Sequence, residues 1–132
     1  MGLSLRSHNN IPSIRFSYSG FNVIRYLLLA YVEQKDFKEV QKDNYLYHFL
    51  NAHEDESYPF KDLISHSDMD GHWDFEAITQ LNEDFAKHYS DIRDFILKEK
   101  LMDEKYIDMT FNGLPHFLKK HAEIKGSRID FS

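Results

Sequence analysis

The sequence predicts an α+β fold that is mostly helical and contains a small antiparallel sheet. Apolar and polar residues alternate in the first 18 residues, helical spacing dominates the middle of the chain, and alternation returns at residues 128–131. Strands are therefore expected near both ends of the sequence, with helices between them. The 132 residues are enough for one globular domain, 1–132, with a hydrophobic core of its own.

The first 18 residues predict a hairpin of two strands. Leu3 and Leu5 alternate with polar residues in the first strand, and residues 14–18 alternate in the same way. A period of two places one face of each strand against a core and the other face in water. Residues 8–12 are rich in turn formers, so we expect them to connect the two strands.

Helical spacing begins after Ser19, whose hydroxyl is predicted to cap the first helix. The apolar positions of this helix are Phe21, Ile24, Leu27, Leu28, Tyr31 and Val32. Tyr26 and Leu29 add apolar surface on its other side. A helix that is apolar around most of its circumference lies between other elements, so we expect this one at the centre of the fold.

The next part of the chain predicts shorter elements. A second helical pattern covers residues 37–50, with a break expected at 43–44. Residues 51–59 are predicted as a loop, because this segment is polar and contains a proline. A short apolar turn follows at residues 60–64, and residues 65–73 are predicted as a second loop.

The last third of the chain is again helical in pattern. A continuous helix over residues 74–100 would be about 40 Å long, more than the expected width of the domain, so we predict a break near Ser90. Another helical stretch covers residues 104–111. The final helix is predicted to have Pro115 in its first turn and to be stopped by Gly126, before the C-terminal strand.

Composition and charge exclude several classes of function. Sixteen basic residues against 22 acidic ones give a net charge of −6, which argues against wrapping a nucleic acid. The absence of cysteine excludes disulfides, thiolate metal sites and a cysteine nucleophile. The longest apolar run, residues 26–32, is too short to span a bilayer, and no secretory signal is recognisable. We therefore expect a cytoplasmic protein that binds neither nucleic acid nor membrane.

Basic residues gather toward the C-terminus of this acidic chain. The group comprises His116, Lys119, Lys120, His121, Lys125 and Arg128. Basic side chains late in a helix complement the helix dipole. We therefore interpret the group as a solvated face of the last helix.

Residues 65–74 hold the clearest concentration of metal-ligating side chains in the sequence. The candidate ligands are His66, Asp68, Asp70, His72 and Asp74. Alternate side chains of a curled loop point toward a common centre, and Gly71 permits the sharp turn that such a loop needs. Aligned on this glycine, the segment is similar to the first half of an EF-hand calcium loop.

Three interpretations of this loop stay open. Calcium binding is disfavoured by His66 at the first ligand position and by Ala77 where a bidentate glutamate is usual. The two histidines and the carboxylates also suit a divalent transition ion such as zinc, manganese or iron. In the third interpretation the acidic side chains bond their own backbone, and Asp74 caps the following helix without any metal.

Short motifs along the chain resemble those of a group of proteins. They are Met1-Gly2-Leu3-Ser4, Tyr18-Ser19-Gly20-Phe21 with Arg25, His66-Ser67-Asp68-Met69-Asp70-Gly71, and the ending at residues 128–132. Together these motifs resemble a group of small uncharacterised bacterial and phage-associated proteins. The resemblance spans the chain and implies no known activity. Ala77 departs from the fuller EF-hand-like pattern that members of this group often carry.

These observations favour a non-enzymatic protein-binding or regulatory domain of bacterial or prophage type. No nucleotide-binding or hydrolase motif occurs in the sequence. Abundant aromatic residues and a negative net charge favour a protein partner. We expect a monomer or weak homodimer without a cofactor. The alternative is a metal-binding module that holds Ca²⁺ or a divalent transition ion in the loop at residues 66–74.

Overall fold

The computed structural model describes residues 2–42, 57–66, 71–100 and 113–132. Its architecture confirms the predicted α+β class, with a small antiparallel sheet that includes an N-terminal hairpin and a C-terminal strand. The predicted break at 43–44, the predicted helix at 104–111 and the loop residues 67–70 lie outside the described residues.

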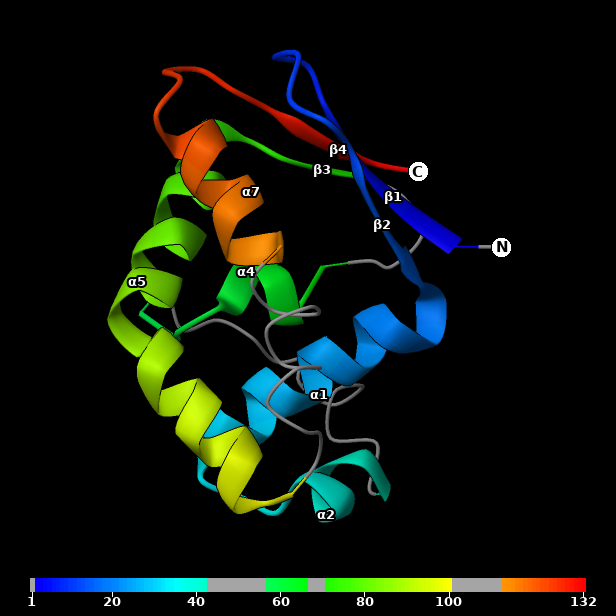
Figure 1. Cartoon of the computed structure of the whole chain (residues 1–132), viewed down its shortest axis with the longest axis vertical. Coiled ribbons are helices and arrows are strands. Elements are labelled where there is room, and N and C mark those ends of the chain that lie inside the picture. Colours follow the sequence, from blue (N-terminus) through cyan, green and yellow to red (C-terminus); the bar gives the residue numbers. More distant parts are fainter. Residues whose placement is uncertain (1, 43–56, 67–70, 101–112) are drawn as a thin grey trace.

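The sheet has four strands in the order β2-β1-β4-β3, and every neighbouring pair is antiparallel. The strands are β1 (Gly2–Ser7), β2 (Ile14–Ser17), β3 (His72–Trp73) and β4 (Ile129–Phe131). Leu3 pairs with Phe16 and Leu5 pairs with Phe131, so these apolar residues share one face of the sheet. The first and last strands of the chain lie side by side at its centre (Figure 1).

The strand β3 differs from the prediction, which placed this segment in a loop. Trp73 pairs with Ile129 and is buried, while His72 pairs with Asp130 and is exposed. The indole Nε1 of Trp73 donates a hydrogen bond to the Asp62 carbonyl at 3.1 Å, which satisfies the polar group of the buried ring. Two residues are too few to show a period of two, so this strand depends on its long-range pairing.

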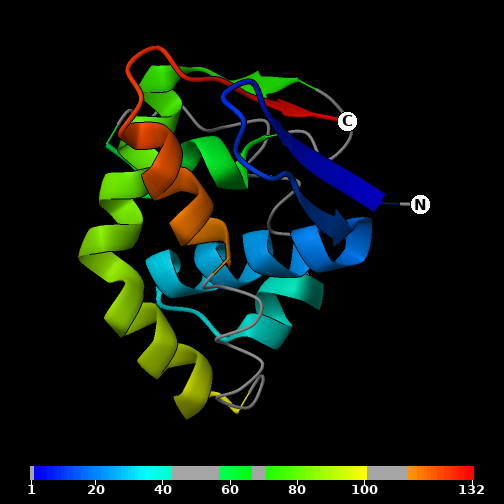
Figure 2. The same ribbon diagram turned by 45° about the horizontal axis from the view of Figure 1, so that its top comes forward.

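The described residues form five helices on one side of the sheet (Figure 2). They are α1 (Tyr18–Glu33), α2 (Phe37–Lys42), α4 (Lys61–Ile64), α5 (Phe75–Lys98) and α7 (Gly113–Ala122). None of these five is long and apolar enough to cross a bilayer.

The helix α1 follows β2 directly, and Ser17 caps it rather than the predicted Ser19. Ser17 Oγ accepts a hydrogen bond from the Gly20 N–H at 2.9 Å, and the Ser17 backbone is extended as an N-cap requires. Residues 27–30 are buried one after another, so every side of the helix is covered there. This confirms the central position that the sequence predicts for the helix.

The helix α5 runs unbroken for 24 residues, so the predicted break near Ser90 was wrong. Ile92 and Ile96 are buried and continue the apolar stripe of Phe85 beyond that serine. The helix lies along the long axis at one edge of the molecule, where its length of about 36 Å fits (Figure 1). The prediction failed because it took the width of the domain as the limit rather than its longest dimension.

The helix α7 has Pro115 in its first turn, as predicted, and ends at Ala122, four residues before the predicted stop at Gly126. In the first turn the missing N–H of the proline costs no hydrogen bond. Gly126 has a φ of +80° in the turn between α7 and β4, a left-handed conformation that suits glycine.

Candidate functional site

The ring of His66, the first predicted metal ligand, is part of the aromatic packing beside β4. It stacks on Phe131 with ring centroids 3.9 Å apart, and Trp73 meets the same phenylalanine edge-on at 4.7 Å. His66 Nε2 donates a hydrogen bond to the His72 carbonyl at 3.2 Å. Gly71 lies so close that a Cβ at this position would be 3.1 Å from the His66 ring. The His66 ring therefore packs the loop against Phe131 of β4, and its Nε2 is bonded to the backbone carbonyl of His72.

His72 and Asp74 lie in different structural settings. His72 is exposed on the outer face of the sheet, opposite β4. Asp74 Oδ1 accepts a hydrogen bond from the Ala77 N–H at 2.8 Å and caps α5, as the sequence predicts. Among the described residues, no three histidine, aspartate or glutamate side chains come together to hold a metal. Asp68 and Asp70 lie outside these residues, so a metal site in the loop stays a prediction.

Asp74 also lines a polar cavity of about 250 Å³ together with Asp62 and Glu76. Lys61 lines the same cavity and offsets part of the negative charge. The three carboxylates do not form a group that could hold a metal within the described part of the chain.

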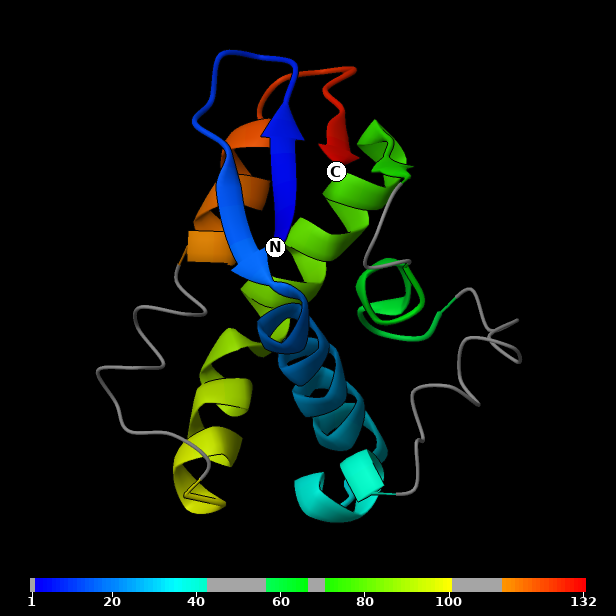
Figure 3. The same cartoon turned by 90° about the vertical axis from the view of Figure 1, so that its right-hand side faces the viewer.

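The outer face of the sheet gathers charged side chains from distant parts of the sequence. Arg6, Asp130 and His72 stand opposite one another in a row across β1, β4 and β3. Arg15 in β2 lies on the same face, opposite Ser4. Arg6, Arg15 and His72 are exposed. The hairpin stands in front of the helices in Figure 3, so the described helices leave this face open.

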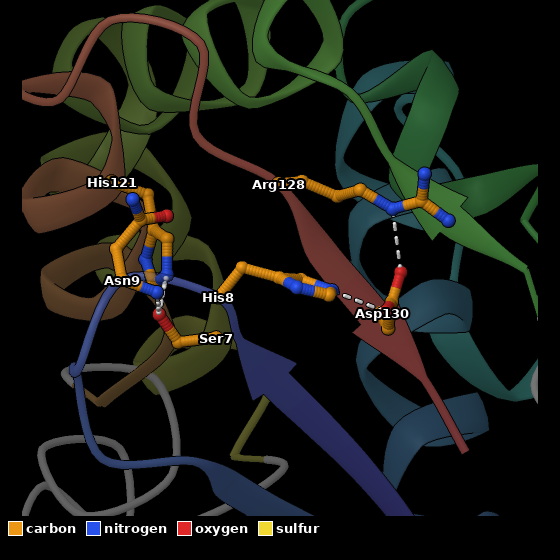
Figure 4. A network of polar contacts seen from close by, with 6 residues as sticks. All are labelled: Ser7, His8, Asn9, His121, Arg128 and Asp130. Carbon is orange, nitrogen blue, oxygen red and sulfur yellow. Dashed lines mark hydrogen bonds and ion pairs between the residues drawn. The ribbon is translucent and has the colours of Figure 1, made fainter.

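Asp130 is the centre of the polar contacts on this face. Its Oδ1 accepts a hydrogen bond from Arg128 Nε at 2.8 Å, and its Oδ2 contacts His8 Nε2 (Figure 4). The Arg128 hydrogen bond is the main cause that lowers the pKa of the Asp130 carboxyl, and the His8 hydrogen bond adds to it. The side chains of His8 and Arg128 remain 55% and 53% exposed, so both present their outer surfaces to solvent.

A second polar network lies behind the sheet around His121, which is fully buried. His121 Nδ1 donates a hydrogen bond to the Phe117 carbonyl at 2.7 Å. Its Nε2 accepts a hydrogen bond from Ser7 Oγ at 2.7 Å, which Figure 4 shows. A neutral imidazole has one donor and one acceptor nitrogen, so both nitrogens of the neutral ring have a hydrogen-bond partner. Burial lowers the pKa of the ring, and the hydrogen bond to Phe117 opposes this in part.

Ser7 and His121 have the contact of a nucleophile and its base, but their surroundings favour a structural role. The histidine is fully buried, and Ser7 Oγ also accepts a hydrogen bond from the Asn9 backbone N–H at 2.9 Å. Neither residue lines the cavity beside Asp74 or the cavity of about 390 Å³ between α5 and α7. The pair therefore joins the end of β1 to α7 and has no adjacent described cavity in which a substrate would react.

Sequence reasoning missed both networks. His121 was interpreted as part of a solvated face, which is wrong, although it follows Leu114, Phe117 and Leu118 on the apolar stripe of its helix. That spacing is the signal that could have revealed its burial. The outer face carries no comparable signal, because its residues meet only through the register of the sheet.

Comparison with protein-family models, with curated proteins and with solved structures finds no match for this chain. The resemblance to small bacterial and phage-associated proteins therefore stays a prediction.

Proposed function

We propose that this chain is a non-enzymatic protein-binding domain whose outer sheet face holds an acidic segment of a partner protein. The observation that carries the proposal is that Arg6, Arg15 and Arg128 share the described outer face. Arg128 is bonded to the carboxylate of Asp130, Arg6 stands opposite Asp130, and Arg15 lies on the strand beyond, opposite Ser4. A guanidinium pairs with a carboxylate through two parallel hydrogen bonds, so exposed arginines suit a segment rich in aspartate and glutamate.

The charge of the face contrasts with that of the whole chain. The chain carries a net charge of −6, whereas the described strands present three arginines and the carboxylate of Asp130 on the outer face. An acidic partner is therefore attracted to this face and repelled by the chain as a whole. Such a distribution favours one docking orientation over others.

Asp130 orders part of the face before any partner arrives. Its carboxylate holds the Arg128 guanidinium through Nε at 2.8 Å and contacts the His8 ring on its other oxygen. An arginine that is held in place loses less side-chain entropy when it binds, which favours association. The remaining guanidinium nitrogens of Arg128 are the groups that would contact the partner's carboxylates.

A protein segment fits this face better than a nucleic acid does. A nucleic acid presents a long row of phosphates, and its affinity depends on many basic contacts. The described face offers three arginines in a chain with a net charge of −6. A short acidic segment needs only a few ion pairs and presents less negative charge to the rest of the domain.

Fluorescence anisotropy with a short fluorescein-labelled peptide of alternating glutamate and serine tests the proposal. We expect saturable binding at low salt, and a loss of about tenfold or more in affinity when Arg6, Arg15 and Arg128 are all changed to glutamate. The matched control changes three exposed helix lysines to glutamate and shifts the net charge equally. These lysines are Lys38, Lys87 and Lys98. We expect the control to retain most of the affinity.

Two outcomes would contradict the proposal. Equal losses in the face variant and in the lysine control would show that only net charge matters. Tighter binding of a single-stranded oligonucleotide of the same length, lost in the face variant, would assign the face to nucleic acid instead. Circular dichroism of both variants establishes that each one remains folded.

A further inference from the structure

A groove of about 390 Å³ lies between α5 and α7, away from the residues used in the proposed function. Its α5 wall consists of Asn82, Phe85, Ala86 and Tyr89. These positions recur at steps of three and four residues, so they form one stripe along the helix. The volume lies within the range of sites that bind small organic molecules.

The floor of the groove is apolar and held in place. Phe85 is buried, and its ring meets Phe60 edge-on with centroids 4.8 Å apart. Tyr89 adds a second, half-buried ring one turn further along α5. Ala86 is exposed and has a small side chain, so it leaves open space beside these rings. The two aromatic rings of this floor, with open space beside them, favour a flat aromatic ligand.

The opposite wall of the groove is cationic. It consists of Pro115, His116 and Lys119 from α7, and both basic residues are exposed. No aspartate or glutamate is among the described residues that line the groove, so the positive charge has no carboxylate beside it within the lining. An anionic group is therefore complementary to this wall, and the apolar floor suits the rest of the ligand.

We infer that the groove between α5 and α7 binds a small aromatic carboxylate. The ring of the ligand packs on Phe85 and Tyr89, and its carboxylate faces the Lys119 ammonium and the His116 imidazole. An ammonium pairs with a carboxylate as a point charge, so Lys119 supplies most of the selectivity for an anion. This inference is independent of the outer sheet face, since none of the lining residues belongs to a strand.

A nuclear magnetic resonance titration with 2-naphthoate and with its neutral analogue 2-naphthamide tests the inference. We expect saturable amide shifts at the lining residues and an affinity for naphthoate about fivefold or more above that for naphthamide. Lys119→Gln should remove this difference between the two ligands. The matched control Lys120→Gln should preserve it, because Lys120 is exposed on the same helix and does not line the groove.

A second variant tests the location independently of charge. Ala86→Trp places a large side chain at an exposed helix position beside the groove, so the fold should be retained while both ligands lose binding. The inference is overturned if naphthoate shifts residues elsewhere, if Lys119→Gln and Lys120→Gln behave alike, or if Ala86→Trp binds as the unchanged chain does. Absence of any saturable shift with naphthoate would overturn it as well.

Discussion

At the scale of single residues, His121 links the end of β1 to α7 and to the turn that follows α7. Its ring accepts a hydrogen bond from Ser7 at the end of β1 and donates one to Phe117 within α7. Its backbone carbonyl accepts a hydrogen bond from Ser127 Oγ at 2.6 Å, in the turn before β4. The ring is fully buried, so these bonds are not replaced by water.

Replacing His121 with leucine should therefore destabilise the fold. The variant removes both ring hydrogen bonds and leaves the Ser7 hydroxyl without its acceptor, at an expected cost of about 1–2 kcal/mol in unfolding free energy. Urea unfolding measures this change. His116→Leu on the exposed side of the same helix is the control and should change stability by less than about 0.5 kcal/mol. Equal effects of the two substitutions would contradict the role given to His121.

The same residue predicts a pH dependence of stability. Burial lowers the pKa of His121 in the folded chain. In the unfolded chain the imidazole has its ordinary pKa of about 6.5, so there it takes up a proton at a pH where the folded chain keeps it neutral. Stability is therefore lost as the pH falls below about 6.5, and this loss is absent from His121→Leu. We expect the stability difference between the two proteins to shrink between about pH 7.5 and about pH 5.5. A difference that is constant or grows in acid would contradict the prediction.

At the scale of elements, α5 connects the sheet end of the molecule to its opposite end. Asp74 caps it beside β3, and Ile92 and Ile96 are buried in its last turns. Tyr31 of α1 packs against Phe95 with centroids 6.0 Å apart, so the second half of α5 is held by tertiary contacts. The continuous stripe of buried residues accounts for the absence of a break.

This continuity predicts a severe effect of proline in the middle of α5. Ser90→Pro removes a backbone donor and introduces a ring that clashes with the preceding turn, at an expected cost of about 3 kcal/mol or more. Ser90→Ala is the control and should change stability by no more than about 0.5 kcal/mol. Thermal or urea unfolding compares the two variants. Equal stability of the proline and alanine variants would contradict a continuous helix at this position.

The loop before α5 carries a prediction about metals. His66 Nε2 binds the His72 carbonyl and Asp74 caps α5, so both groups have partners without an ion. We expect saturating calcium, zinc or manganese, or their removal with EDTA, to shift the melting temperature by less than about 1 °C. A saturable rise that Asp74→Asn abolishes would establish a metal site, because asparagine retains the cap and loses the charge.

At the scale of the whole molecule, the sequence predicts those features that depend on local patterns. Alternation identified the hairpin near the N-terminus and the strand near the C-terminus, and helical spacing identified the central position of α1. The short strand β3 was missed because its two residues become a strand only by pairing with β4. Ser17 was missed as a cap because the change from strand to helix occurs within one residue of it.

The candidate site depends more than the fold does on pairing between strands that are distant in the sequence. Arg6, His72 and Asp130 come from three separate segments, and only the strand order β2-β1-β4-β3 brings them into one row. A pattern read along the chain contains no information on that order. The net charge of −6 also concealed a locally basic face, because composition averages over the whole surface.

The central claim is that the outer sheet face is the surface that binds an acidic segment. Backbone amide shifts measured during a titration with the glutamate–serine peptide test it most directly. We predict that the largest saturable shifts cluster at Arg6, Arg15, Arg128 and Asp130, and that added salt reduces them together. Shifts that centre on α5 and α7, with the four strand-side residues unchanged, would contradict the claim.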